Sequence, residues 1–380
     1  MKKFDLIVTT TFGIEAVTKR EIEKLGYKNL KVENGKVELK GDVRDIAILN
    51  TWLRTGERVF IKMAEFTATS FESLFDQTTA INWPSLIPID GKMHVVGKSV
   101  NSTLYSVPDC QSIVKKAIVK AMTNHYEVDY FDEDGPVYKI EVAILKDVVT
   151  LSVDTSGVGL HKRGYRVHAG AAPLKETLAA ALVMLGRWKF KEPMIDPFCG
   201  SGTILIEAAM FARNMAPGLN RSFACEEWPG FDAKIFSQVR EEANTKAFMD
   251  KAYKLIGYDI DAGVLKQAKS NAKAAGVGGD IAFLQRNFED FASTSEYACL
   301  ITNPPYGERL SEEEEVRKLN EMLGDLRDDY PYWGINVFTA FGGFERDFGE
   351  AANKNRKLYN GRILTRYYQY YSQNEEKKKI

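Results

Sequence analysis

The chain has 380 residues, of which 44% are hydrophobic and 27% charged, and this composition excludes a disordered, collagen-like or coiled-coil protein. At roughly 150 residues per domain, the length predicts two or three domains with substantial cores. Lys and Arg number 51 against 52 Asp and Glu, a net charge of −1, so a nucleic-acid partner would have to bind local basic patches.

The spacing of cysteines and histidines argues against disulfides and metal sites. Cys110, Cys199, Cys225 and Cys299 are far apart and form no CxxC pair, which is typical of a protein of the reducing cytoplasm. The four histidines lack the HExxH spacing or a similar one, so we expect no metal. No apolar run approaches the roughly 18 residues of a membrane span, and we expect no signal peptide, anchor or membrane partner.

The first 165 residues predict two small α+β units. The first has a strand at 4–8, a helix at 14–25, a hairpin at 30–39, a helix at 43–52 and a strand at 58–66. The hairpin is indicated by Asn34-Gly35, a pair typical of primed two-residue turns. The second has a helix at 71–81, a strand at 93–100, a helix at 110–122 and strands at 137–145 and 148–153. We therefore expect domains at 1–66 and 67–165.

After Tyr165 the pattern changes to an alternation of strands and helices. Strands are predicted at 194–197, 255–260, 281–285, 297–302 and 335–341, and helices at 174–185, 203–211, 262–275 and around 316–326. This alternation predicts a third domain, at 166–380, with a parallel sheet covered by helices on both faces and a β-rich tail at 362–371. The insertion between Arg213 and Tyr253 has a helical run from Ala233, and we expect it to be a helical elaboration above this sheet.

The first predicted strand of this domain ends in a glycine-rich turn before a helix, a context in which backbone can approach a ligand. The turn reads Asp196-Pro197-Phe198-Cys199-Gly200-Ser201-Gly202-Thr203. It lacks the Lys of a P-loop and the third glycine of a dinucleotide fingerprint. Asp196 can accept hydrogen bonds from an ammonium, and the helix N-terminus offers free N–H groups, so a zwitterionic amino-acid cofactor is favoured.

The next two strands end in further polar residues. Asp259 stands in Gly257-Tyr258-Asp259-Ile260-Asp261, where it can accept both hydroxyls of a ribose, whereas Asp261 suits a helix cap. The third strand ends before Arg286-Asn287-Phe288-Glu289-Asp290, from which a side chain could read an adenine amino group. Each signal is weak alone, because strand-to-helix turns often carry such residues.

The fourth strand ends in Asn303-Pro304-Pro305-Tyr306-Gly307. The side-chain oxygen of Asn303 and the carbonyl of Pro304 can both accept hydrogen bonds from a planar amino group and so direct its lone pair toward an electrophile. The two prolines stiffen the loop, and Tyr306 offers a face on which a flipped base can stack. The pattern favours a functional site over a plain Pro-rich turn, because it lies at the same sheet edge as the glycine-rich turn.

Together these motifs resemble the class I S-adenosylmethionine-dependent methyltransferases with an Asn-Pro-Pro-Tyr loop. The segments 152–166 and 172–179 also resemble the THUMP-domain-containing 23S rRNA guanine-N2-methyltransferases. The resemblance implies an α/β fold, in which a Rossmann-like methyltransferase domain follows α+β ferredoxin-like and THUMP units. It implies four catalytic residues, Asn303, Pro304, Pro305 and Tyr306. It implies S-adenosylmethionine as the cofactor, with contacts from Pro173, Thr177, Asp196, Pro197, Phe198, Gly200, Gly202, Thr203, Asp259, Ile260, Asn287 and Asp290.

Two basic groups are candidates for RNA contact. Lys115, Lys116 and Lys120 lie on the predicted helix 110–122, away from its apolar side. Lys162, Arg163 and Arg166 directly precede the predicted catalytic domain. The alternatives are a solvated helix face for the first group and an interdomain linker held by salt bridges for the second.

The resemblance implies methylation of the exocyclic N2 of a guanine in 23S rRNA, as free RNA or in a ribosomal assembly intermediate, in the cytoplasm. The residues of the loop alone do not distinguish this amine from adenine N6, cytosine N4, a tRNA guanine or a protein glutamine. A catalytically idle RNA-binding protein and a nicotinamide oxidoreductase are further alternatives, which the intact Asn303 loop and the missing third glycine disfavour. The sequence does not indicate an oligomeric state.

Overall fold

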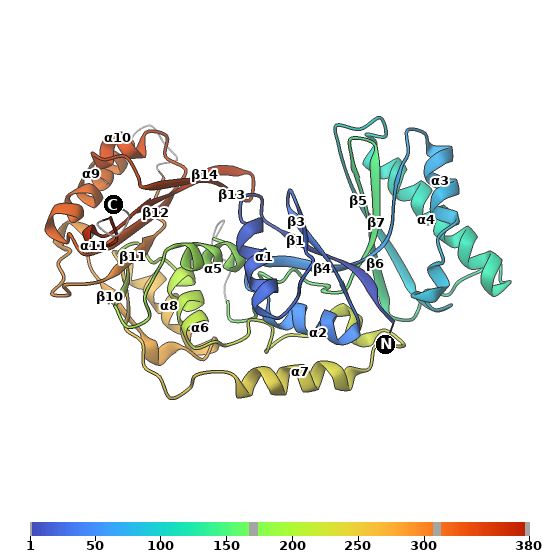
Figure 1. Cartoon of the computed structure of the whole chain (residues 1–380), viewed down its shortest axis with the longest axis horizontal. Coiled ribbons are helices and arrows are strands. Elements are labelled where there is room, and N and C mark those ends of the chain that lie inside the picture. The colour runs from blue at the N-terminus through green and yellow to red at the C-terminus, as the bar shows by residue number, and fades with distance from the viewer. Residues whose placement is uncertain (1, 167–173, 307–312, 377–380) are drawn as a thin grey trace.

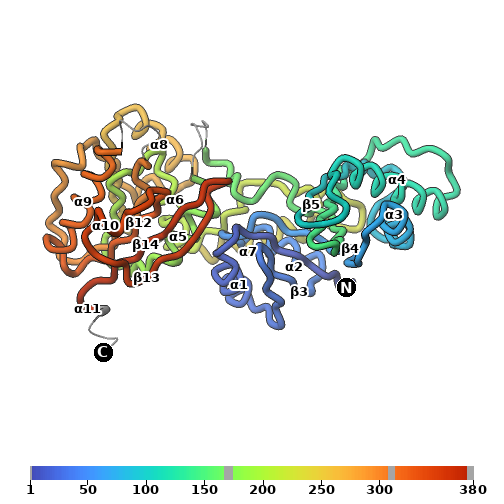
Figure 2. Tube along the Cα trace, turned by 90° about the horizontal axis from the view of Figure 1, so that it is seen from above, coloured from blue at the N-terminus to red at the C-terminus, as the bar shows by residue number. Residues whose placement is uncertain are grey.

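The computed structural model describes residues 2–166, 174–306 and 313–376, which form two seven-stranded sheets flanked by helices (Figure 1). The molecule is elongated, with one sheet near each end and helices α3 and α4 at the tip farthest from the second sheet (Figure 2). Within the described residues, no helix is both long and apolar enough to span a membrane. All four cysteines are buried, and none of them forms a disulfide.

The two expected α+β units share one continuous sheet, here called the front sheet. Its order is β2-β3-β1-β4-β7-β6-β5. The strands are β1 (Phe4–Thr10), β2 (Lys31–Glu33), β3 (Lys36–Gly41), β4 (Gly56–Thr67), β5 (Lys92–Val100), β6 (Val137–Leu145) and β7 (Val148–Asp154). Strand β4 joins the units because its 12 residues pair with β1 along one side and with β7 along the other. The domain limit expected between residues 66 and 67 thus falls within a strand, and the limits themselves stay a prediction.

Four helices cover one face of the front sheet: α1 (Glu15–Lys24), α2 (Val43–Trp52), α3 (Phe71–Thr79) and α4 (Val107–Tyr126). A single apolar core runs between sheet and helices, from Ile22 of α1 to Ile118 of α4. Asp42 begins α2 as a capping box with Asp45, which satisfies backbone donors that a helix start leaves free. These elements lie where their apolar periodicity predicts them.

The second sheet, here called the catalytic sheet, has the order β10-β9-β8-β11-β12-β14-β13. Its strands are β8 (Met194–Asp196), β9 (Leu255–Asp259), β10 (Ile281–Gln285), β11 (Cys299–Thr302), β12 (Gly334–Thr339), β13 (Lys354–Asn360) and β14 (Ile363–Tyr370). The first five are parallel, and β14 and β13 are antiparallel. Strand β13 was not expected, because its polar start, Lys354 to Lys357, is typical of a loop and only pairing with β14 orders it.

Helices cover both faces of the catalytic sheet, as expected for a doubly wound fold. One apolar cluster includes residues of α5 (Glu176–Leu185), α6 (Thr203–Ala212) and α8 (Ala262–Ala274). The other includes residues of α9 (Glu313–Asp329) and α10 (Phe344–Phe348). A short helix, α11 (Gln373–Glu376), follows β14.

The insertion at 213–253, here called the strap, is not an elaboration above the catalytic sheet, and that expectation was wrong. Its helix α7 (Ala233–Thr245) packs against α2 under the front sheet (Figure 1). Trp228 of the strap is buried, stacks on Tyr138 of β6 at 4.6 Å between ring centroids, and donates from Nε1 to the carbonyl of Val137 at 3.1 Å. The strap therefore completes the core of the front half and ties both halves together.

A second contact between the halves is apolar. Ile14 and Val17, at the start of α1, belong to the same buried cluster as Leu178 of α5 and Leu358 of β13. Because α1 covers the front sheet as well, the first unit is wedged directly against the catalytic sheet. The front half thus has a defined position relative to the strand ends described next.

Candidate active site

Strands β8 and β11 are neighbours, and the residues at their carboxyl ends meet. The Thr302 hydroxyl donates to Oδ1 of Asp196 at 2.6 Å, and the backbone N–H of Phe198 donates to the same oxygen at 3.2 Å. Asp196 is 1% exposed, and burial, with the nearby charge of Asp259, raises its pKa to about 7 despite these bonds. No ion pair to Asp196 occurs within the described residues. A buried carboxyl without a cation suits a ligand ammonium.

The glycine-rich turn forms an open cradle beside Asp196. Gly200 has φ +50°, and no atom lies within 4 Å of the position that a Cβ would occupy. Gly202, at φ +81°, precedes α6 without a side-chain cap, so first-turn N–H groups of this helix face the turn. A Cβ on Gly202 would lie 3.0 Å from the ring of Phe283, so packing as well as φ requires glycine there.

Asp259 joins the ends of β8 and β9. Its Oδ2 accepts from the N–H of Gly200 at 2.9 Å, and its Oδ1 accepts from the N–H of Asp261 at 3.0 Å. Each carboxylate oxygen keeps acceptor capacity for a ribose hydroxyl. Ile260 beside it is 66% exposed, an apolar surface next to the acid. Asp261 caps α8 by accepting from the N–H groups of Gly263 and Val264, the role expected of it.

The residues expected at the adenine end lie past β10. Asn287 and Asp290 are exposed, and Asn287 caps a short turn by accepting from the N–H of Glu289 at 3.3 Å. Phe288 is buried, and its ring lies 4.8 Å from that of Phe198, which joins this turn to the glycine-rich turn. Both polar side chains are therefore accessible to a ligand, and their role stays a prediction.

The Asn303 loop starts where β11 ends. The Tyr306 hydroxyl donates to Oδ1 of Asn303, the oxygen expected to accept from a substrate amine. Burial raises the pKa of Tyr306, so its hydroxyl stays protonated and able to donate. Pro304 is buried and Pro305 is exposed, which anchors one side of the loop and leaves the other open.

Arg166 does not fit the RNA contact expected of it. Its guanidinium is half-buried, donates to the Thr203 hydroxyl at 2.8 Å and to the carbonyl of Leu174 at 3.1 Å, and lies 3.4 Å from Glu176. Thr203 is the first residue of α6, so Arg166 lies at the glycine-rich turn. This arginine therefore belongs to the lining of the site.

Two further expected RNA contacts are engaged inside the protein. Arg163 is 4% exposed, pairs with Glu207 at 3.4 Å and donates to the carbonyl of Leu160 at 2.6 Å. Lys115 pairs with Glu133 and donates to the carbonyl of Met93 at 2.8 Å. The placement of Arg163 corrects its expectation, because a buried, paired cation is not available to phosphate. Lys115 is half-buried and paired, and its RNA contact stays a prediction. Of the residues expected to contact RNA, the exposed ones are Lys116, Lys120 and Lys162.

Glu57 of β4, which sequence reasoning missed, connects the front half to the start of α5. Its carboxylate accepts from the hydroxyl of Thr177 at 2.6 Å and lies 3.4 Å from both Lys175 and Nδ1 of His161. Although burial raises its pKa, His161, Thr177 and Lys175 together lower that pKa to about 2. Thr177 is thus bound to Glu57, and Pro173 lies outside the described residues. No local signal marks Glu57, since His161, Lys175 and Thr177 are more than 100 positions away in the chain.

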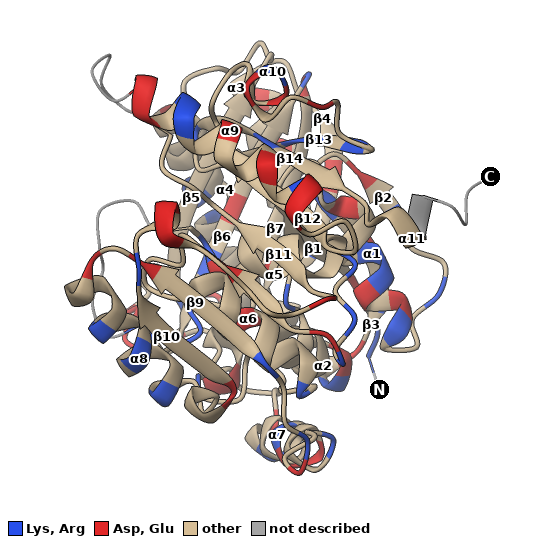
Figure 3. Cartoon of the chain, turned by 90° about the vertical axis from the view of Figure 1, so that its left-hand side faces the viewer, with Lys and Arg blue, Asp and Glu red and all other residues tan. Residues whose placement is uncertain are grey.

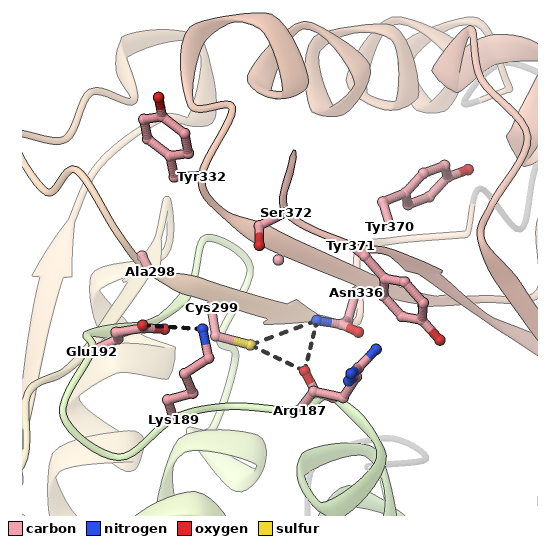
Figure 4. Close-up of a pocket in the computed structure, with 12 residues that line it drawn as sticks. Arg187, Lys189, Glu192, Ala298, Cys299, Tyr332, Asn336, Tyr370, Tyr371 and Ser372 are labelled. Carbon is pink, nitrogen blue, oxygen red and sulfur yellow. Dashed lines mark hydrogen bonds and ion pairs between the residues drawn. The ribbon is translucent and has the colours of Figure 1, made fainter. Parts of the chain in front are cut away.

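A cavity of about 20 Å³ lies at the opposite, amino-terminal ends of β11 and β12 (Figure 4). There Asn336 donates to the carbonyl of Leu300 at 3.1 Å, and the Cys299 thiol donates to the carbonyl of Gly186 at 3.4 Å. This volume holds about one water molecule, and the polar groups already have partners. The cavity is therefore a feature of the packing and is separate from the strand ends that carry Asp196 and Asn303.

A doubly wound sheet, with a buried acid and an open glycine turn at one strand end and an amine-orienting loop at the next, defines a class I methyltransferase. The chain belongs to the RMKL-like methyltransferase family, whose domain model matches residues 163–369. The RlmL ferredoxin-like domain matches residues 5–60, and the THUMP domain matches residues 68–154. These matches confirm the family and fold class expected from the motifs.

Known proteins are similar to this one over nearly the whole length of the chain. "Putative RNA methyltransferase YpsC" of Bacillus subtilis is 47% identical over 374 residues, covering 98% of this chain and 97% of that protein. The structure of "a predicted N6-adenine-specific DNA methylase" from Listeria monocytogenes is 48% identical and superposes with a TM-score of 0.93, covering 98% and 97%. SMU.472, "a putative methyltransferase complexed with SAH", is 40% identical with a TM-score of 0.92, covering 98% and 99%. The protein is therefore an S-adenosylmethionine-dependent RNA or nucleic-acid methyltransferase with a THUMP domain.

Proposed function

We propose that the enzyme methylates the exocyclic N2 of a guanine in 23S rRNA. The observation that carries this proposal is that Thr302 and Asn303 are adjacent in the chain. Thr302 donates a hydrogen bond to Asp196, and Asn303 can orient an amine. The RlmL ferredoxin-like match, the THUMP domain and the RNA methyltransferase name of YpsC support RNA as the substrate. The choice of guanine N2 rests on the resemblance of the whole chain to the rRNA guanine-N2-methyltransferases.

Residues at the sheet edge supply a matching group for each part of the cofactor. We assign the ammonium to Asp196, the ribose hydroxyls to Asp259 and an apolar face of the adenine to Ile260, which is exposed beside Asp259. Gly200 leaves space for close backbone approach. S-adenosylmethionine, when bound, supplies a methyl group made electrophilic by the sulfonium.

The Asn303 loop orients the substrate amine. Oδ1 of Asn303 and the carbonyl of Pro304 accept hydrogen bonds from the two N–H groups of the amine. The lone pair of the amine nitrogen then points at the methyl carbon. The N–C bond forms while the S–C bond breaks, and the sulfur keeps the electron pair. Stacking on Tyr306 is worth about 1–3 kcal/mol, comparable to the few kcal/mol that flipping a base costs.

A strong general base is not needed for this reaction. An aromatic amine is a poor nucleophile because its lone pair is delocalised, so positioning is the main contribution. After methyl transfer the nitrogen is acidic, and its extra proton leaves to a carbonyl oxygen or to solvent. Asn303 therefore acts by accepting hydrogen bonds and undergoes no change in protonation.

RNA contact is assigned to the exposed Lys116, Lys120 and Lys162, with a cytoplasmic 23S rRNA or ribosomal assembly intermediate as the partner. Four cysteines without a disulfide fit a reducing compartment. We retain 1–66, 67–165 and 166–380 as the domain limits, with β4 and the strap crossing between them.

The proposal is tested by mass spectrometry of nucleosides from 23S rRNA of cells with and without this gene. We expect N2-methylguanosine to decrease in the deletion strain and to be restored by purified protein with labelled cofactor. An unchanged N2-methylguanosine content would contradict the guanine assignment.

Adenine N6 is the second candidate, because the similar Listeria structure carries an N6-adenine-specific DNA methylase name. Asn303 and Pro304 could hold that amine by the same two hydrogen bonds. Loss of N6-methyladenosine from RNA or DNA of the deletion strain, with unchanged N2-methylguanosine, would favour this alternative.

A further inference from the structure

The solvent face of α8 carries three exposed lysines, Lys266, Lys269 and Lys273, here called the lysine row. Their spacing of three and four residues places them on one side of the helix. The helix contains no Asp or Glu, and the residues between the lysines on this face, Gln267 and Ser270, are polar and exposed. Figure 3 shows the row as successive blue patches on α8, beside β9 and β10.

The lysine row has no ion pair or hydrogen bond to another described residue, whereas many lysines of this protein are paired. Lys36 and Lys62 of the front sheet, for example, each contact two or more glutamates. Lys269 and Lys273 are also one turn apart, and like charges at that spacing destabilise a helix. An unneutralised row of this kind suits an external polyanion.

The row begins close to the proposed reaction site. Helix α8 starts at Ala262, three positions after Asp259, and β9 is separated from β11 by β8 alone. With strands about 4.8 Å apart, the ends of β9 and β11 are roughly 10 Å apart. A helix of 13 residues is about 20 Å long, so the lysines are spread over roughly 15–30 Å from Asn303. A nucleic acid with one base at Asn303 can extend along this helix.

We propose that the lysine row binds the phosphate backbone of the RNA substrate beside the methylated nucleotide. This proposal rests on the proposed function for the nature of the RNA. Polar residues between the lysines offer no apolar anchor of the kind that membrane surfaces and protein hot spots use, and evenly spaced cations match evenly spaced phosphates. The catalytic domain thereby contributes its own RNA contact in addition to the front half.

The test compares the full-length enzyme with the triple variant Lys266→Gln, Lys269→Gln, Lys273→Gln. The affinity for a 23S rRNA fragment is measured between about 50 and 250 mM KCl. Binding that depends on phosphate contacts weakens strongly with salt over roughly this range. The logarithm of the association constant falls linearly with the logarithm of the salt concentration. Losing three phosphate contacts should make this negative slope shallower by about 2–3 and weaken binding at least tenfold at low salt. The turnover number at saturating RNA and the affinity for S-adenosylmethionine should be unchanged.

A matched control is the triple variant Lys24→Gln, Lys28→Gln, Lys234→Gln, which removes the same charge from exposed positions outside α8. We expect its salt slope to match that of the wild type. An unchanged slope in the α8 variant, or an equal decrease in both variants, would overturn the proposal. The two proposals can fail separately. If the wild-type enzyme methylates no guanine of the RNA, but the salt slopes of the wild type and the α8 variant still differ, the proposed function fails and the lysine row remains an RNA-binding surface.

Discussion

The Tyr306 hydroxyl donates a hydrogen bond to Oδ1 of Asn303, and so occupies the acceptor that the proposed mechanism reserves for the substrate amine. The same tyrosine is the expected stacking platform for the flipped base. The side chain therefore has two separable functions, one in its hydroxyl and one in its ring. Substitutions at this position distinguish them.

Tyr306→Phe should keep the ring and free Asn303, so we expect kcat/KM for RNA to change by less than about threefold. Tyr306→Ala removes stacking worth about 1–3 kcal/mol, which should lower kcat/KM roughly 10- to 100-fold. Steady-state kinetics with an RNA substrate measure both. Equal losses in the two variants would mean that the hydroxyl, and not the ring, carries the function.

Asn303→Ala should lower turnover about 100- to 1000-fold, the usual effect of losing one positioned hydrogen-bonding group. The affinity for S-adenosylmethionine should stay within about twofold, because Asp196 is held by Thr302 and not by Asn303. Single-turnover methylation and calorimetric titration measure the two quantities. Near-normal turnover would remove Asn303 from the mechanism.

The affinity for S-adenosylmethionine should rise with pH across about 7. Burial raises the pKa of Asp196 to about 7, and the protonated carboxyl below this pH cannot pair with an ammonium. Below pH 7 the affinity should fall by up to about tenfold per pH unit. The cofactor-free protein should show the opposite trend in stability between pH 4 and 7, since its folded state binds this proton more tightly than the unfolded state.

Asp196→Asn provides the control for this pH dependence. The amide does not titrate, so binding should be weak and nearly independent of pH between 6 and 8, which calorimetry can measure. A wild-type affinity that is flat over this range would contradict the assignment of the ammonium to Asp196.

Glu57→Gln should lower the free energy of unfolding near neutral pH by about 3 kcal/mol, the equivalent of a pKa lowered from 4.5 to about 2. This stabilisation is present above pH 4.5 and is lost as pH falls toward 2, because the carboxylate must be charged to hold Lys175 and His161. Urea unfolding of both proteins at several pH values checks the prediction. A difference that does not shrink in acid would contradict it.

The strand ends that carry Asp196, Asp259 and Asn303 could be predicted because their signals are local. Each is a polar residue that directly follows a short apolar strand, and parallel strands put their carboxyl ends at one edge. Apolar periodicity likewise predicted most helices and strands to within a few residues. The family resemblance added the cofactor, which the comparisons confirm.

Tertiary structure decided the roles of charged and partly apolar segments. A basic sequence such as that of Arg163 and Arg166 carries no local sign of whether an acid such as Glu207, more than 40 positions away, will bury it. The apolar face of the strap could cover either sheet, and only Trp228 stacking on Tyr138 determines which. The order of elements and the site chemistry thus follow from local patterns in the sequence, whereas burial, pairing and the joining of the halves depend on contacts between residues far apart in the chain.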